Sequence, residues 1–284
     1  MAIPGLTIIG ESINDSVPST HALFEANDLA GIVQLAKSQA ELGAAYVDVN
    51  VGLRAPAFMA EMVRAIQRVT DKPLSIDSPD AALARAGLEA CDPGRGTPLL
   101  NSISPLRLEM FDLLAVRPFR PVLLATENVK DGVEAPCTTP EETYEAAKLL
   151  LQTARSRGLA NADCIIDPGI SPLAADTEGH LRRLMGALHL IHDDPGFAGV
   201  HLSVGLSNFT VMLPAKRADG SPVKAPLASA FLTRAMPLGL DTVIGSVKSP
   251  YALLPEGHPA LQCFDECLAA EGFDVLMRVQ EFYS

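Results

Sequence analysis

Residues 45–52 read Ala-Tyr-Val-Asp-Val-Asn-Val-Gly, a short run rich in β-branched residues that passes directly into polar residues and glycine. Such a run predicts a buried strand, because β-branched side chains favour an extended backbone. A stretch with helical period follows it, and the same alternation recurs along the chain. Repeated pairs of strand and helix indicate a parallel sheet, because parallel strands need a long crossover connection.

Eight such pairs are predicted. Their strands are short and comprise residues Leu6–Gly10, Ala45–Val49, Leu74–Asp77, Pro98–Ser102, Pro121–Ala125, Cys164–Asp167, Val200–Leu206 and Thr242–Gly245. The helices between and after them are predicted to begin near Asp28, Ala57, Pro79, Pro105, Thr139, Thr177, Pro226 and Pro259. Several of these starts carry Pro or a Ser, Thr or Asp cap, as helix N-termini commonly do.

The chain has 284 residues, which fits one α/β domain better than two. Eight strand-helix pairs without a second composition class predict a single-domain (β/α)8 TIM barrel over residues 1–284, with an open doubly wound sheet as the alternative. Two long loops, residues 127–138 and 209–225, follow the fifth and seventh strands. They are predicted to lie on the face where barrel enzymes carry their chemistry.

Composition argues against several classes of partner. The formal charge of −12 and the pI near 4.9 disfavour nucleic acid and anionic membrane surfaces, which attract basic patches. No apolar run approaches the roughly 18 residues of a membrane span, and residues 1–14 lack the features of a secretory signal. We therefore expect a cytoplasmic protein. Five cysteines without a Cys-x-x-Cys pair predict reduced, buried thiols.

Polar residues recur where the predicted strands end. The six segments are Gly10-Glu11-Ser12-Ile13-Asn14, Asp48-Val49-Asn50-Val51-Gly52, Ile76-Asp77-Ser78, Asn101-Ser102-Ile103-Ser104, Ile166-Asp167-Pro168-Gly169 and Gly205-Leu206-Ser207-Asn208. In a closed barrel these side chains converge on one acidic, amide-lined pocket. A single Asp or Asn at a strand end is more often a helix cap or turn residue, but six together favour a binding site.

A pocket of this composition suits a ligand with many N–H donors and one or two carbonyl groups. Asp accepts hydrogen bonds, and Asn both donates and accepts them. The edge of a reduced pterin ring has this pattern.

These six segments, taken together and in this order, resemble the pterin-binding methyltransferases over residues 6 to 250. That family includes the methyltetrahydrofolate:corrinoid protein methyltransferases and the folate domain of cobalamin-dependent methionine synthase. The resemblance implies a methyltransferase that moves a methyl group between tetrahydrofolate and the cobalt of a corrinoid protein.

The resemblance also implies roles for individual residues. Asp77, Asn101 and Asp167 would hold the pterin ring, and Asn208 would sit beside the ring nitrogen that carries the methyl group. The residues implied to shape the pocket around them are Glu11, Asn14, Asp48 and Asn50. Lys216 and Arg217 fall near a basic loop position that relatives place close to the corrinoid.

The chain departs from the family pattern in two places. Ser12 stands where the family has Arg, and Val211 stands where a relative carries a polar residue. The cobalt must come from a separate corrinoid protein, because the chain lacks the Asp-x-His-x-x-Gly signature of a corrinoid-binding module. A homodimer is a further expectation from the resemblance.

Three other functions are weighed. Dihydropteroate synthase shares the barrel and the pterin site but carries a Ser-Arg-Lys run where this chain has Ser207-Asn208-Phe209. A metal-dependent lyase or hydrolase could use His189 and His192, although these lie on a predicted outer helix and are expected to be surface residues. We therefore predict no metal site. A folate-binding protein without activity is separated from an enzyme only by turnover.

Overall fold

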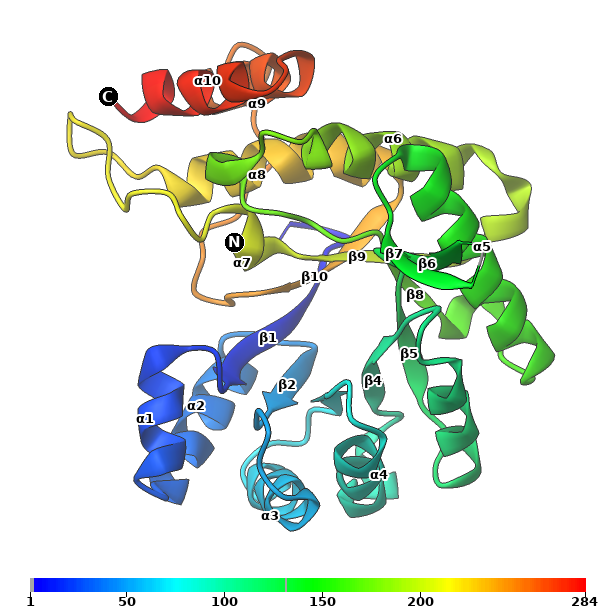
Figure 1. Cartoon of the computed structure of the whole chain (residues 1–284). Coiled ribbons are helices and arrows are strands. Elements are labelled where there is room, and N and C mark those ends of the chain that lie inside the picture. The colour runs from blue at the N-terminus through cyan, green and yellow to red at the C-terminus, as the bar shows by residue number, and fades with distance from the viewer. Residues whose placement is uncertain (1–2, 131) are drawn as a thin grey trace.

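The chain folds into one closed barrel of parallel strands surrounded by helices (Figure 1). The computed structural model describes residues 3–130 and 132–284. In this part of the chain, eight strands are hydrogen-bonded in the order β1-β10-β9-β8-β5-β4-β3-β2, and β1 also pairs with β2 to close the ring. The predicted (β/α)8 barrel is therefore confirmed.

The barrel strands are β1 (Thr7–Asn14), β2 (Tyr46–Asn50), β3 (Leu74–Asp77), β4 (Leu99–Ile103), β5 (Arg120–Leu124), β8 (Ile165–Asp167), β9 (His201–Gly205) and β10 (Leu240–Gly245). The α-helices are α1 (Pro18–Glu25), α2 (Leu29–Glu41), α3 (Pro56–Gln67), α4 (Ala81–Ala90), α5 (Pro140–Ser156), α6 (His180–Asp193), α7 (Leu206–Phe209), α8 (Lys224–Ala235), α9 (Pro259–Ala269) and α10 (Phe273–Tyr283). Short 3-10 helices are η1 (Pro93–Arg95), η2 (Leu108–Ala115), η3 (Asn161–Asp163), η4 (Leu173–Ala175), η5 (Pro195–Phe197) and η6 (Met236–Leu238).

All eight predicted strands are present, but several other predictions need correction. The element predicted as a helix near Pro105 is the 3-10 helix η2. Residues 127–138, predicted as a loop, contain an antiparallel hairpin of β6 (Glu127–Lys130) and β7 (Val133–Pro136); residue 131 of that loop lies outside the described residues. The seventh strand ends at Gly205, because Leu206 already begins α7. Helices α1 and α10 had no counterpart in the sequence prediction.

Side-chain caps fix the starts of several helices, as the sequence predicted. The Asp28 carboxylate accepts a hydrogen bond from the Gly31 N–H at 2.9 Å, which satisfies a free donor at the start of α2. Helix α5 begins after Thr139, whose hydroxyl accepts from the Glu142 N–H at 3.2 Å. These caps start α2 after α1 and α5 after the hairpin of β6 and β7.

The two-residue period of the strands separates the inside of the barrel from its outside. Val47, Val49 and their equivalents on other strands pack outward against the helical layer. A smaller cluster of Ile9, Leu99, Val122 and Ile165, with Tyr46 and Ile244 packed against it, fills the barrel interior. The polar strand residues follow these inward positions by two residues on β1, β2, β4 and β8, so they lie on the same inner face nearer the carboxyl ends.

The outer layer carries no sign of disulfide or membrane-spanning structure in residues 3–130 and 132–284. All five cysteines are free and buried, as predicted. None of the described helices combines the length and the apolar character needed to cross a bilayer.

Candidate active site

A layer of polar side chains covers the apolar barrel floor. On β2, Tyr46, Asp48 and Asn50 alternate inward, and on β4 Leu99 is followed two residues later by Asn101. The register pairs Asp77 with Asn101 and Asn14 with Asn50. The structure therefore brings the predicted residues of strands β1 to β4 to one end of the barrel, where catalytic residues of barrel enzymes are found.

Asp48, Asn50 and Asp77 form the acidic side of this layer. The Asn50 amide donates a hydrogen bond to Asp77 Oδ2 at 2.9 Å, and its carbonyl oxygen accepts from the Gly52 N–H at 2.9 Å. Asn50 is thereby fixed in orientation from both ends. Asp48 is 1% exposed, and its carboxyl group lies among the side chains of Ser75, Asp77 and Asn101.

Burial sets the protonation of these carboxyl groups. It raises the pKa of Asp48 well above its usual range, and the neighbouring charge of Asp77 raises it further. Burial also raises the pKa of Asp77, partly offset by the hydrogen bond from Asn50. Asp48 therefore keeps its proton to higher pH than an exposed aspartate. The Asp77 side chain is only partly buried, so a donor-rich ligand can reach its carboxyl oxygens.

Asp167 belongs to β8, two strands beyond β4 around the barrel. Its Oδ1 accepts from the Gly169 N–H at 2.8 Å, and its Oδ2 accepts from the Ser203 hydroxyl at 3.2 Å. Burial raises the pKa of Asp167 to about 6, while these two hydrogen bonds and the charge of Arg183 act in the opposite direction. A carboxyl group with this pKa changes charge close to neutral pH.

Arg183 on α6 holds the turn that follows Asp167. Its guanidinium is buried and donates to the carbonyl oxygens of Pro168 at 2.7 Å and Gly169 at 3.0 Å, and to the Thr143 hydroxyl at 2.8 Å. Gly169 has a φ of +73°, and a Cβ there would lie 2.0 Å from Thr126 Cγ2, so only glycine fits. The Asp167-Pro168-Gly169 segment is thus a rigid turn.

Glu11 on β1 and Ser207 after β9 are in contact at the barrel mouth. The Ser207 hydroxyl donates a hydrogen bond to Glu11 Oε1, although β10 separates their strands in the ring. Burial raises the pKa of Glu11, and the bond from Ser207 partly offsets this. Ser207 lies in the single turn α7, so this contact ties α7 to β1.

Asn208 is the next residue of α7 and is exposed at the barrel mouth. Its amide nitrogen lies close to Gly205, where an added Cβ would approach it to 3.0 Å. Within residues 3–130 and 132–284, no hydrogen bond engages the Asn208 side chain. Its amide is therefore available to a ligand seated on the polar layer.

The remaining predicted residues have other surroundings. The side-chain oxygen of Asn14 accepts hydrogen bonds from the Ser16 N–H at 2.9 Å and from the Ser16 hydroxyl at 2.6 Å. Asn14 therefore stabilises the turn after β1. Arg217 lies over the Phe282 ring of α10, with 4.6 Å from its guanidinium carbon to the ring centroid. Lys216 is exposed and pairs its backbone with Pro222 in a short bridge.

Sequence reasoning missed Ser203 and Arg183. Ser203 lies inside a predicted strand, and the alternation of side chains along that strand could have indicated that Ser203 faces the barrel interior. Arg183 lies on a predicted helix, but its partners are 14 and 15 positions earlier, so only the packed structure identifies them. His189 and His192 are exposed on α6, as expected for surface residues. No cluster of three potential metal ligands occurs in the described part of the chain.

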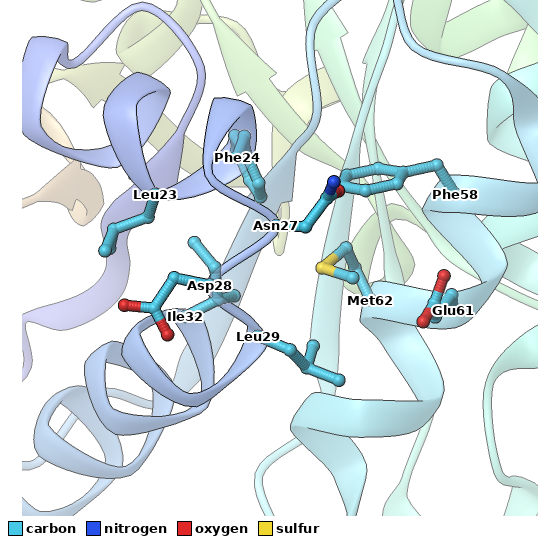
Figure 2. Close-up of a pocket in the computed structure, with 9 residues that line it drawn as sticks. All are labelled: Leu23, Phe24, Asn27, Asp28, Leu29, Ile32, Phe58, Glu61 and Met62. Atoms are coloured by element: carbon cyan, nitrogen blue, oxygen red, sulfur yellow. The ribbon is translucent and has the colours of Figure 1, made fainter.

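A separate pocket of about 90 Å³ lies in the helical shell between α1, α2 and α3 (Figure 2). Figure 2 shows side chains from all three helices around it, among them Phe24, Leu29 and Met62. Small-molecule sites usually occupy roughly 300–1,000 Å³, so this pocket is too small for a pterin ring. The barrel mouth remains the candidate site.

Known proteins resemble this chain in sequence and in fold. Over 247 residues, covering 84% of each chain, the sequence is 29% identical to the methylcorrinoid:tetrahydrofolate methyltransferase of Eubacterium limosum. The fold is similar to dihydropteroate synthase from Xanthomonas albilineans in complex with 7,8-dihydropteroate, with a TM-score of 0.58, 16% identity and coverage of 99% of this chain and 94% of that one. Dihydropteroate synthase of Yersinia pestis gives a TM-score of 0.57, also at 16% identity, with 94% of each chain covered.

The two solved structures share too little sequence to indicate more than the fold. The family model for pterin binding enzymes matches residues 13–245, which include every strand that carries the polar layer except residues 7–12 of β1. This range extends over more than half of the chain. The chain belongs to the pterin binding enzyme family.

Proposed function

We propose that the protein is a methyltransferase that moves a methyl group between tetrahydrofolate and the cobalt of a separate corrinoid protein. The observation that carries the proposal is the unengaged Asn208 amide at the barrel mouth, next in α7 to Ser207, which contacts Glu11. The relative that matches 84% of the chain supports it, since that protein is a methylcorrinoid:tetrahydrofolate methyltransferase. Both 5-methyltetrahydrofolate and tetrahydrofolate would be substrates, and the reaction would be reversible.

The polar layer would hold the pterin ring. Asp77 and Asp167 lie on opposite flanks of β4 and would present carboxylate oxygens to ring N–H groups, while Asn101 could both donate and accept. Asp48, Asn50 and Glu11 would complete the pocket around the ring. Asn50 would act mainly by fixing Asp77, given the 2.9 Å hydrogen bond between them.

Methyl transfer from a tertiary amine needs help at the departing nitrogen. When the bond from N5 to the methyl carbon breaks, its electron pair stays on N5, and a proton or hydrogen bond there lowers the barrier. Asn208 can accept from a protonated N5 through its oxygen or donate to an unprotonated N5 through its NH2 group. The cobalt of the partner supplies the nucleophile or, in reverse, the methyl group. The barrel would position the pterin so that the methyl faces the open mouth.

Two alternatives are less well supported. Dihydropteroate synthase would need basic residues after the seventh barrel strand, and this chain has Ser207-Asn208-Phe209 there. A folate-binding protein without turnover would keep the ring contacts but leave Asn208 without a chemical role.

Incubation of the purified protein with methylcobalamin and tetrahydrofolate tests the proposal. We expect formation of 5-methyltetrahydrofolate at a rate that depends on enzyme concentration. Folate binding without any methyl transfer, to free cobalamin or to a corrinoid protein, would contradict the proposed activity. Formation of dihydropteroate from p-aminobenzoate and a pterin diphosphate would favour the first alternative.

A further inference from the structure

The ammonium groups of several lysines near the barrel mouth have no part in the contacts described so far. Lys216, Lys224 and Lys248 lie in or beside the loops after β9 and β10, and none forms an ion pair within the part of the chain that the structure describes. By contrast, Arg54, another mouth residue, pairs with Asp15 and Glu25 at 2.6 Å each. In a chain with a net charge of −12, unpaired lysines on one side of the mouth favour an anionic ligand there.

One of these lysines lines a cavity beside α7. The cavity is about 280 Å³ and is walled by Ser207, Thr210, Val211, Lys224, Ser249 and Tyr251 together with neighbouring alanines and leucine. An engineered apolar cavity of about 150 Å³ holds benzene, so this one has room for an aromatic ring and a polar extension. Its lining combines apolar surface, three hydroxyls of Ser and Thr, a tyrosine and one ammonium group.

This cavity adjoins the pterin layer. Ser207 belongs to both, because its hydroxyl donates to Glu11 while the residue also lines the cavity. Tyr251 is 8% exposed, and its hydroxyl lies so close to Gly245 at the end of β10 that an added Cβ there would approach it to 3.0 Å. The ammonium group of Lys224 has only a long contact, 3.4 Å, to the Val211 carbonyl oxygen, so it can turn to a stronger partner.

The chemistry of folate connects the two regions. In 5-methyltetrahydrofolate, the carbon that carries the p-aminobenzoyl-glutamate arm is bonded directly to N5. A pterin whose N5 faces Asn208 therefore begins its arm beside α7. The arm consists of an aromatic ring, an amide and glutamate carboxylates, which match the apolar, hydroxyl and cationic parts of the cavity lining.

We propose that the cavity beside α7 binds the p-aminobenzoyl-glutamate arm, and that Lys224 pairs with a glutamate carboxylate. This inference rests on the proposed function, because it requires the pterin ring to lie on the polar layer with N5 at Asn208. It assigns the ring and the arm to different residues, so the two parts of the ligand can be tested separately. The ion pair at the open mouth is expected to weaken with added salt.

The test measures dissociation constants by calorimetry for two ligands, 5-methyltetrahydrofolate and 5,6-dimethyltetrahydropterin, which lacks the arm. The variant is Lys224→Met, which removes the charge and keeps much of the apolar chain. We expect it to weaken binding of methyltetrahydrofolate about tenfold, in the range for loss of a charged hydrogen bond, and to leave the armless pterin within twofold. Lys37→Met is the matched control: it makes the same charge change at an exposed position of α2, outside the cavity lining, and should leave both constants unchanged.

Each other outcome contradicts the inference in a different way. Equal binding of both ligands by the wild-type protein would show that the arm contributes nothing, while the pterin site and the proposed function would stand. Equal weakening of both ligands in Lys224→Met would move this lysine to the ring. Unchanged folate binding together with slower methyl transfer to a corrinoid protein would assign Lys224 to the partner surface. Failure of the wild-type protein to bind either ligand would reject the proposed function itself.

Discussion

The Ser207 hydroxyl donates a hydrogen bond to the Glu11 carboxylate, joining residues 196 positions apart in the sequence. This contact fixes the single turn α7 against β1, and Asn208 is the following residue of that turn. Because α7 is too short to be stable alone, its position depends on such tertiary contacts. Glu11 is thus a positioning residue for the amide that we place at the reacting nitrogen.

Replacement of Glu11 tests this positioning role. Glu11→Ala removes the acceptor of Ser207 and is expected to slow single-turnover methyl transfer about tenfold or more, corresponding to at least about 1.4 kcal/mol. Glu11→Gln keeps a side-chain oxygen and should recover most of the rate. If Ala and Gln variants transfer methyl equally fast at saturating folate, the contact with Ser207 does not position Asn208.

Two carboxylates are expected to carry most of the ring binding. Asp77→Ala and Asp167→Ala should each weaken binding of tetrahydrofolate by about 1.5 to 3 kcal/mol, the cost of removing a charged hydrogen-bond partner. Calorimetry measures both affinities, and Glu41→Ala, at an exposed position of α2, provides the control for lost charge. Wild-type affinity in both variants would remove the pterin ring from this layer.

Affinity for folate should depend on pH through Asp167. Its pKa is about 6 in the folded protein, above the ordinary value of 3.8, so the free protein binds a proton there as the pH falls below 6. If the ionised form accepts from a ring N–H, binding at pH 5 should be about tenfold weaker than at pH 7.5. Asp167→Asn should reduce this dependence.

The raised pKa of Asp167 also makes the free energy of unfolding depend on pH. A carboxyl group with a raised folded pKa favours folding when protonated, so its contribution is present below the unfolded value and is lost as pH rises through about 6. Asp167→Asn should therefore raise the ligand-free protein's unfolding free energy more at pH 7.5 than at pH 4.5. Urea denaturation at the two pH values measures this difference, and an equal change at both would contradict the assigned pKa.

Two adjacent arginines of α6, one buried and one exposed, allow a matched comparison of their contributions to the unfolding free energy. Arg183→Met leaves the carbonyl groups of Pro168 and Gly169 without their buried donor and should lower the unfolding free energy by about 1–3 kcal/mol. Arg182→Met removes an exposed ion pair with Glu271 and should cost less than about 1 kcal/mol. Urea denaturation compares the two variants, and equal costs would show that Arg183 does not support the turn.

The sequence predicted the parts of the fold that depend on local pattern. The barrel strands are short apolar runs, and the polar residues that end six of them reach the mouth whatever the helices do. Local pattern did not reveal η2, because Leu108–Ala115 has a helical distribution of apolar residues but forms 3-10 turns. The hairpin of β6 and β7 was also missed, because its pairing is short and half of its residues are polar.

Local sequence pattern also located the polar residues of the candidate site, but it did not reveal the contacts around them. Strand ends identified Asp77, Asn101 and Asp167, since register places them without knowledge of the helices. The contacts that orient Asp167 were not predictable, because Ser203 donates to it across 36 positions and Arg183 holds the following turn from 14 or 15 positions away. Such pairings depend on how the barrel closes and how helices pack on it.

The central claim is that the Asn208 amide acts on the nitrogen whose charge changes during transfer. A contact that is stronger in the transition state than in the bound substrate lowers the barrier, whereas an equally strong contact only tightens binding. The decisive measurement is single-turnover transfer between 5-methyltetrahydrofolate and cob(I)alamin by Asn208→Ala, with folate affinity measured separately. We predict a rate constant at saturation lowered about tenfold or more, with a smaller loss of affinity. Transfer at the wild-type rate by the saturated variant would contradict this role and reduce Asn208 to a turn residue.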